Sequence, residues 1–119
     1  MRFYFDMFDM TLVNQAVKQI VSTLMPEKVI VFGSVAKGTA TENSDLDILV
    51  VMETDLTFPY REVRVREVIS NIKIPKDVLV LTPSEYAEDK KDPWDIAYEI
   101  SRTGLVLYDA SKKQCAEIS

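Results

Sequence analysis

The fold of this chain is decided by residues 29–52, which read VIVFGSVAKGTATENSDLDILVVM. A first apolar run ends at Gly33-Ser34, and a second one opens on Asp45 and Asp47. Short apolar runs bounded by turn residues are typical of buried strands. The stretch therefore predicts two buried strands, joined by a short helical turn and a polar loop.

Asp45 and Asp47 predict a cation site. Side chains two residues apart in a strand point to the same face, so these two carboxylates lie together. Like charges at close range raise each other's pKa and repel, which makes the pair costly without a cation. Mg²⁺ prefers such hard oxygen ligands and is usually completed by water and substrate phosphates.

Gly33 and Ser34 predict a phosphate site beside those carboxylates. Gly33 has no side chain where the backbone must turn or let a phosphate approach. Ser34 is expected to cap a short helix over 34–38, whose free N–H groups attract anions. A lone Gly-Ser is usually a turn and a lone Asp-x-Asp a solvated strand start, but the two together between apolar strands favour a nucleotide site.

The whole chain is expected to form a single domain, residues 1–119, with 110–119 as a frayed, flexible tail. Its 119 residues are 47% hydrophobic, as in a globular protein. Helices are expected over 9–25, 59–72, 83–90 and 93–103, and further strands over 78–81 and 105–108. Helices that alternate with short buried strands predict an α/β or α+β fold, with helices packed on a small mixed sheet.

Several side chains are assigned to the core or to the solvent from helical spacing alone. The helix over 59–72 is expected to bury Val65, Val68, Ile69 and Ile72. Its charged residues are expected to form a solvated face, namely Arg61, Glu62, Arg64, Arg66 and Glu67. In the C-terminal half, core positions are expected for Tyr86, Trp94, Ile96, Ala97, Tyr98 and Ile100.

Composition excludes several classes of function. The net charge of −5 argues against nonspecific nucleic-acid binding, which needs a basic surface. The absence of histidine excludes Ser-His-Asp and Cys-His catalysis. The single cysteine, Cys115, cannot form an internal disulfide, so a reducing compartment is expected. No apolar run reaches membrane-spanning length and the N-terminus does not read as a signal peptide, which together predict a cytoplasmic protein.

Asp77 opens a third apolar run, as Asp45 and Asp47 open the second. If the two strands are neighbours, three carboxylates converge at one edge of the sheet. Three carboxylates can hold two metal ions for nucleotidyl transfer, or hold the metals and take a proton from the attacking hydroxyl. The alternative is that Asp77 pairs with Lys73 or Lys76, and the sequence does not show adjacency.

Gly33-Ser34, followed by Ser44-Asp45-Leu46-Asp47 and a hydrophobic strand, resembles the nucleotidyltransferase superfamily that includes DNA polymerase beta. The short chain and its RTGLVLYD ending resemble the minimal nucleotidyltransferases. The resemblance implies the polymerase beta-like fold, two Mg²⁺ ions and ATP as substrate.

It also assigns roles to residues. Asp45, Asp47 and Asp77 would be the catalytic, metal-binding acids, and Gly33, Ser34 and Lys37 would bind the nucleotide. Val35 stands where relatives usually carry an arginine.

The resemblance further implies a partner. Many minimal nucleotidyltransferases act as antitoxins that bind a HEPN-domain ribonuclease toxin and add AMP to one of its tyrosine hydroxyls, so a homo- or hetero-oligomer is conceivable. Two alternatives stay open: an antitoxin that works by binding alone, and a nucleotidyltransferase with a small-molecule acceptor such as an aminoglycoside.

Overall fold

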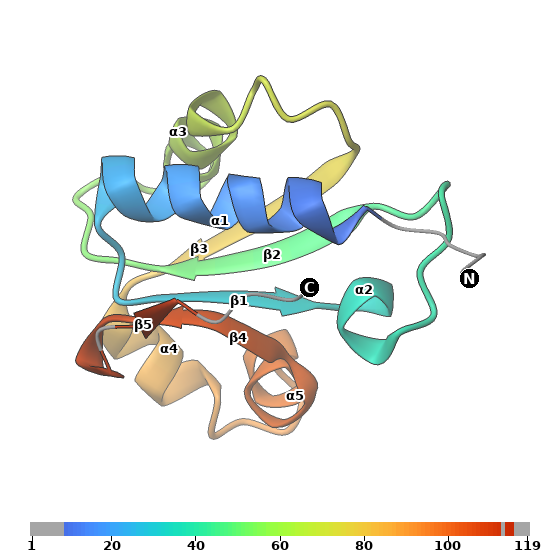
Figure 1. The fold of residues 1–119 in the computed structure, drawn as a ribbon. Coiled ribbons are helices and arrows are strands. Elements are labelled where there is room, and N and C mark those ends of the chain that lie inside the picture. Colours follow the sequence, from blue (N-terminus) through green and yellow to red (C-terminus); the bar gives the residue numbers. More distant parts are fainter. Residues whose placement is uncertain (1–8, 113, 116–119) are drawn as a thin grey trace.

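The computed structural model describes residues 9–112 and 114–115. Its centre is a five-stranded sheet in the order β3-β2-β1-β4-β5 (Figure 1). The strands are β1 (Lys28–Phe32), β2 (Leu46–Val51), β3 (Lys76–Leu81), β4 (Leu105–Asp109) and β5 (Gln114–Cys115). β2 and β3 run parallel, whereas the other neighbours are antiparallel. The predicted mixed sheet with helices is confirmed.

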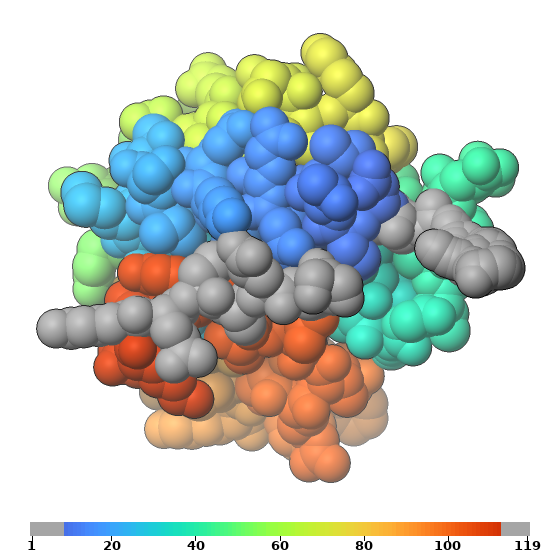
Figure 2. All heavy atoms as spheres, in the orientation of Figure 1, coloured from blue at the N-terminus to red at the C-terminus, as the bar shows by residue number. Residues whose placement is uncertain are grey.

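Helices cover both faces of the sheet. They are α1 (Met10–Leu24), α2 (Ser34–Lys37), α3 (Tyr60–Val68), α4 (Pro83–Asp89), α5 (Ile96–Thr103) and the 3-10 helix η1 (Ala110–Lys112). α1 and α3 pack on one face and α4 and α5 on the other (Figure 1). In Figure 2 the blue atoms of α1 adjoin the yellow-green segment that contains α3. Gln19 Nε2 joins these two helices by donating to Val68 O at 3.0 Å.

The alternation of side chains along β2 divides the core into two parts. Leu46, Ile48 and Val50 are fully buried on the α1/α3 face. Leu49 and Val51 are equally buried on the α4/α5 face. Asp47 shares the parity of the second group, so the α4/α5 face carries its carboxylate.

β3 lies at one edge of the sheet, and two charged residues of α3 cover the backbone of that edge. Arg61 is 8% exposed and Glu62 is 5% exposed, so their predicted place on a solvated face is wrong. Val80 N–H donates to Glu62 Oε2 at 3.1 Å, and Arg61 Nη1 donates to Val80 O at 3.3 Å. The two side chains satisfy backbone groups that an edge strand leaves unpaired.

The last helix begins later than predicted. Asp92 Oδ1 accepts from Trp94 N–H at 3.0 Å, and Asp95 Oδ1 accepts from Ala97 N–H at 2.9 Å. These local bonds hold residues 92–95 in a turn, and Asp95 caps a helix that starts at Ile96. As a result Trp94 is 95% exposed and Ile96 is 54% exposed, so their predicted core positions are wrong.

Other predictions for the C-terminal half are confirmed. Tyr86, Ala97 and Ile100 are buried. Tyr98 is only half-buried, so its predicted core position is not confirmed; its hydroxyl accepts from Arg102 Nη1 at 3.2 Å.

The predicted tail falls partly on described residues. Residues 110–112 form η1, and 114–115 form β5 against Tyr108 and Asp109. The rest of 110–119 lies outside the described residues, as do residues 1–8. Among the helices of the described part of the chain, none is long and apolar enough to cross a membrane.

Candidate active site

The first two predicted acids stand at the beginning of β2. Asp45 precedes the strand and is exposed, while Asp47 is its second residue and is partly buried. Leu46 between them is fully buried in the core. Burial of Leu46 on one face directs its two neighbours to the opposite face, as their spacing predicts.

Asp77 lies directly beside Asp47. The parallel register of β2 and β3 pairs these two residues across the strands. Asp77 is largely exposed, and its Oδ1 lies 3.7 Å from Arg66 Nη2 of α3. The adjacency that the sequence left open is therefore present. The partner of Asp77 in the structure is Arg66, rather than either of the two lysines considered from the sequence.

The electrostatics of Asp47 reflect this crowding. Burial raises the pKa of its carboxyl group above the ordinary value, and the charges of Asp77 and Asp45 raise that pKa further. A carboxylate in this position is most stable when a cation offsets the negative charges around it.

Gly33 lies against the same carboxylate. Its φ is +72°, a backbone conformation that favours glycine, and a Cβ built at this position would collide with Asp47 Oδ2. Only a residue without a side chain fits between the end of β1 and Asp47. The predicted Gly33 and Asp47 motifs thus meet in space.

The short helix after Gly33 forms as predicted, but its cap differs. Gly33 is the N-cap of α2, and Ser34 is the first helical residue, so the predicted capping role of Ser34 is wrong. The turn needs a positive φ at the cap position, which a serine adopts only with strain. Lys37 lies exposed in the last turn of α2, and Gly38 ends the helix in a left-handed conformation.

The three aspartates have the chemistry of a Mg²⁺ site. Their oxygens are hard ligands, Asp47 and Asp77 are paired on adjacent strands with Asp45 just before β2, and the backbone of Gly33 lies against Asp47. Within residues 9–112 and 114–115, no three carboxylate or thiol groups are already gathered around one point.

One residue of this region was not selected from the sequence. Arg66 was assigned to a solvated face, yet it is the cation beside Asp77. Its spacing on the helix gives no signal of this contact, because the contact depends on how α3 crosses β3.

The chain matches known proteins over most of its length. Residues 11–114 match the family model described as "Nucleotidyltransferase domain". A protein of Methanocaldococcus jannaschii, named "Putative protein adenylyltransferase MJ0604", is 30% identical in an alignment of length 103 that covers 80% of this chain and 97% of that protein.

Two solved structures share the fold. A crystal structure from Sulfolobus solfataricus, described as a "putative nucleotidyltransferase", has a TM-score of 0.58 and 20% identity, and the match covers 92% of this chain and 85% of that chain. A chain from the "Crystal structure of the toxin-antitoxin with AMP-PNP" also has a TM-score of 0.58, with 18% identity, covering 83% of this chain and 75% of that chain.

Proposed function

The chain belongs to the nucleotidyltransferase domain family, and from that premise we propose that it transfers AMP from ATP to a hydroxyl group of a partner protein. The observation that carries the proposal is the pairing of Asp47 with Asp77 across β2 and β3, with Gly33 against Asp47. The similar archaeal protein bears the name of a protein adenylyltransferase, which supports a protein acceptor.

We assign the residues as follows. Gly33, Ser34 and Lys37 bind the triphosphate of ATP. Asp45, Asp47 and Asp77 hold Mg²⁺, with two ions expected. When bound, Mg²⁺ would neutralise the triphosphate and lower the pKa of the acceptor hydroxyl.

In the reaction, the hydroxyl oxygen of the acceptor attacks the α-phosphorus of ATP. A new oxygen–phosphorus bond forms, the bond between the α-phosphorus and the bridging oxygen breaks, and pyrophosphate leaves with the electron pair. A carboxylate oxygen of Asp77 takes the hydroxyl proton. Asp77 suits this role because it is more exposed than Asp47 and is open to an incoming group.

The partner that we propose is a HEPN-domain ribonuclease toxin, modified on a tyrosine hydroxyl, with this chain as its antitoxin in the cytoplasm. A structural neighbour of this chain comes from a toxin–antitoxin structure with AMP-PNP, which supports this class of partner. The net charge of −5 is complementary to a basic, RNA-binding partner.

The test is transfer of label from α-labelled ATP, with Mg²⁺, to the protein encoded by the adjacent gene. Asp47→Asn should abolish labelling while the fold is kept. Asp55→Asn is the matched control, because Asp55 lies exposed in the loop after β2 and has no role in the proposed site. Near wild-type labelling by Asp47→Asn would refute the proposal. A stable complex without any label would favour the binding-only antitoxin.

A further inference from the structure

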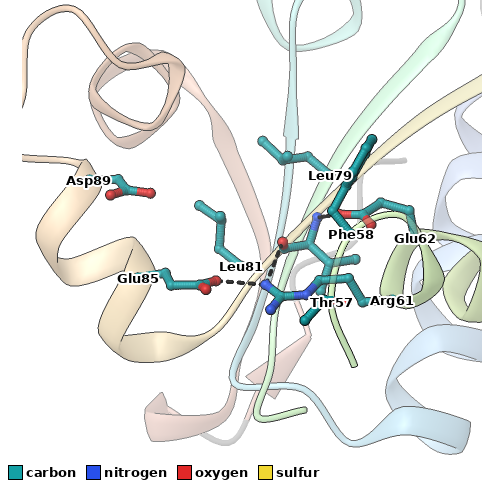
Figure 3. A pocket seen from close by; sticks show the side chains of 9 residues that line it. Thr57, Phe58, Arg61, Glu62, Leu79, Leu81, Glu85 and Asp89 are labelled. Carbon is teal, nitrogen blue, oxygen red and sulfur yellow. Dashed lines mark hydrogen bonds and ion pairs between the residues drawn. The ribbon is translucent and has the colours of Figure 1, made fainter. Parts of the chain in front are cut away.

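A groove runs along β3, between α3 and α4. Its volume is about 550 Å³, and Figure 3 shows the side chains that line it. Leu79 and Leu81 of β3 lie between the two walls, Phe58 and Glu62 lie on the α3 side, and Asp89 lies on the α4 side. None of these five residues belongs to the site proposed above.

The groove begins beside that site. Leu79 and Leu81 share the face of β3 that carries Asp77, because side chains alternate along a strand. The Cα atoms of Asp77 and Leu79 are two residues apart, or roughly 7 Å. β2 lies between β3 and β1, so Asp77 on β3 and Gly33 at the end of β1 flank Asp47 from opposite directions. A molecule seated on these leucines therefore reaches Asp77 from the β3 edge of the sheet, away from Gly33.

Three acids line the groove, Glu62, Glu85 and Asp89, whereas the described residues of its lining include one cation, Arg61. Glu62 Oε1 is buried and has no hydrogen-bond partner among the described residues. The pKa of Asp89 is raised by burial and then by the charges of Asp95, Glu85, Glu88 and Asp92.

Arg61, the one cation among the described residues that line the groove, is already engaged. Arg61 Nη1 lies 2.6 Å from Glu85 Oε1 and also donates to Val80 O, while Arg61 Nε donates to Leu56 O at 3.0 Å. An incoming lysine or arginine would supply the donors and the positive charge that Glu62 and Asp89 lack.

Large apolar side chains are exposed at the α3 side of the groove and near it in the sequence. Phe58 is 76% exposed, and Leu56, Tyr60 and Val63 are 43%, 65% and 46% exposed. An extended segment cannot join the sheet at Val80, because Glu62 and Arg61 occupy its backbone groups. An occupant must therefore rest on side chains rather than add a strand.

We propose that this groove docks a basic, partly apolar segment of the acceptor protein. Apolar residues of the segment cover Phe58, Leu79 and Leu81, and its lysine or arginine residues face Glu62 and Asp89. That the docked segment carries the acceptor hydroxyl rests on the function proposed above. In an in-line displacement the attacking hydroxyl and the leaving pyrophosphate lie on opposite sides of the α-phosphorus. Pyrophosphate would lie toward Gly33, so the hydroxyl would approach from the β3 edge, where the groove lies.

The experiment uses two short fluorescein-labelled peptides. One consists of lysine, leucine and a single tyrosine, and in the other glutamate replaces every lysine. Binding to the full chain is followed by fluorescence anisotropy, without nucleotide. Transfer of AMP to the tyrosine is followed separately with α-labelled ATP and Mg²⁺.

Two variants alter the groove, and each has a matched control. Phe58→Ser removes an exposed apolar side chain from the groove, and Trp94→Ser removes one elsewhere. Asp89→Lys reverses a charge in the groove, and Glu88→Lys reverses the neighbouring charge on α4, which does not line it. A lysine at the C-terminal end of α4 is favourable to the helix, so Asp89→Lys should fold.

The wild type should prefer the lysine peptide to the glutamate peptide. Each groove variant should weaken this binding about tenfold, and each control should stay within about twofold. Equal affinity for the two peptides, or equal loss in variants and controls, would overturn the docking proposal. A loss of ATP affinity in Phe58→Ser would also overturn it, because the groove would then bind the nucleotide base. AMP transfer to an aminosugar that displaces the peptide would overturn it as well, because the groove would then bind a small-molecule acceptor.

Failure of the two proposals can be told apart. If the peptide binds in the groove but AMP is transferred to no protein, the docking proposal stands and the proposed transfer to a protein acceptor is refuted. If the groove variants and their controls transfer AMP to the peptide at equal rates, the proposed transferase function stands and the docking proposal is refuted. Asp47→Asn should bind the peptide normally and transfer nothing.

Discussion

Gly33 and Gly38 have similar backbone conformations and different surroundings. Their φ angles are +72° and +75°, but a Cβ at Gly33 meets Asp47, whereas a Cβ at Gly38 meets no atom within 4 Å. Each Gly→Ala change should lower the free energy of unfolding by about 1–2 kcal/mol, because alanine is strained in a left-handed conformation. Gly33→Ala should also displace the Asp47 carboxylate and lower the transfer rate at least about tenfold.

Urea unfolding and initial transfer rates measure the two effects, with Gly38→Ala as the control for backbone strain. If Gly33→Ala loses no more activity than Gly38→Ala, the close contact with Asp47 does not matter for the reaction.

Asp47 is expected to be kept for activity at the expense of stability. Its folded-state pKa is raised, so ionised Asp47 destabilises the native state at neutral pH. Asp47→Asn should therefore raise the melting temperature at pH 7 by a few degrees. As the pH falls through the raised pKa, native Asp47 takes up a proton, so the difference between variant and wild type should shrink, and it should vanish below the ordinary pKa of an aspartate.

Calorimetry across this pH range tests the sign. Added Mg²⁺ should stabilise the wild type more than Asp47→Asn, because a ligand that binds only the native state raises its stability. A variant less stable than the wild type at pH 7 would mean that Asp47 forms favourable contacts that outweigh the repulsion.

At the level of single residues, the sequence predicts which acids share a face but not which of them meet. The spacing of Asp45 and Asp47 suffices, because alternation is a property of one strand. The pairing of Asp77 with Asp47 depends on the parallel register of β2 and β3, which a local pattern does not contain. The wrong prediction for Ser34 arose because the positive φ of Gly33 is a three-dimensional requirement.

Among the elements, β3 owes the protection of its edge to α3. Glu62→Leu should lower the free energy of unfolding by about 1–3 kcal/mol, because it leaves the buried Val80 N–H without an acceptor. It should also accelerate hydrogen exchange at Val80. Glu67→Leu is the control, since Glu67 is exposed on the same helix.

Glu62→Gln separates the hydrogen bond from the charge. A glutamine keeps a carbonyl oxygen for Val80 N–H, so it should restore most of the lost stability in urea unfolding. Equal destabilisation by the leucine and glutamine variants would show that the charge of Glu62, rather than its hydrogen bond, holds the edge.

The same helix shows how far periodicity predicts an element. Helical spacing predicts the burial of Val65 in α3 and of Ile69 and Ile72 just after it, but it extends the helix to 72, whereas α3 ends at Val68. The same spacing does not predict the burial of Arg61 and Glu62, because these side chains bind the backbone of an edge strand, which no helical pattern reveals. In α5 the start was misplaced, because the hydrogen bonds of Asp92 and Asp95 delay the helix.

For the molecule as a whole, Trp94 provides a simple test of self-association. It is the single tryptophan of the chain and is 95% exposed. Its emission should resemble that of free tryptophan, and acrylamide should quench it almost as efficiently as it quenches a model indole. Weak quenching that strengthens on dilution would show that a second copy covers Trp94. Light scattering would confirm the change in mass.

The crossover between β2 and β3 has a kinetic consequence. β1 and β2 can pair after a short connection, whereas the parallel pair requires closure of the chain over residues 52–75, including α3. Because loop closure costs more entropy for contacts that are farther apart in sequence, we expect this pair to form late in folding. Since Asp47 and Asp77 meet only through it, a refolding chain should regain its far-UV signal before its enzymatic activity.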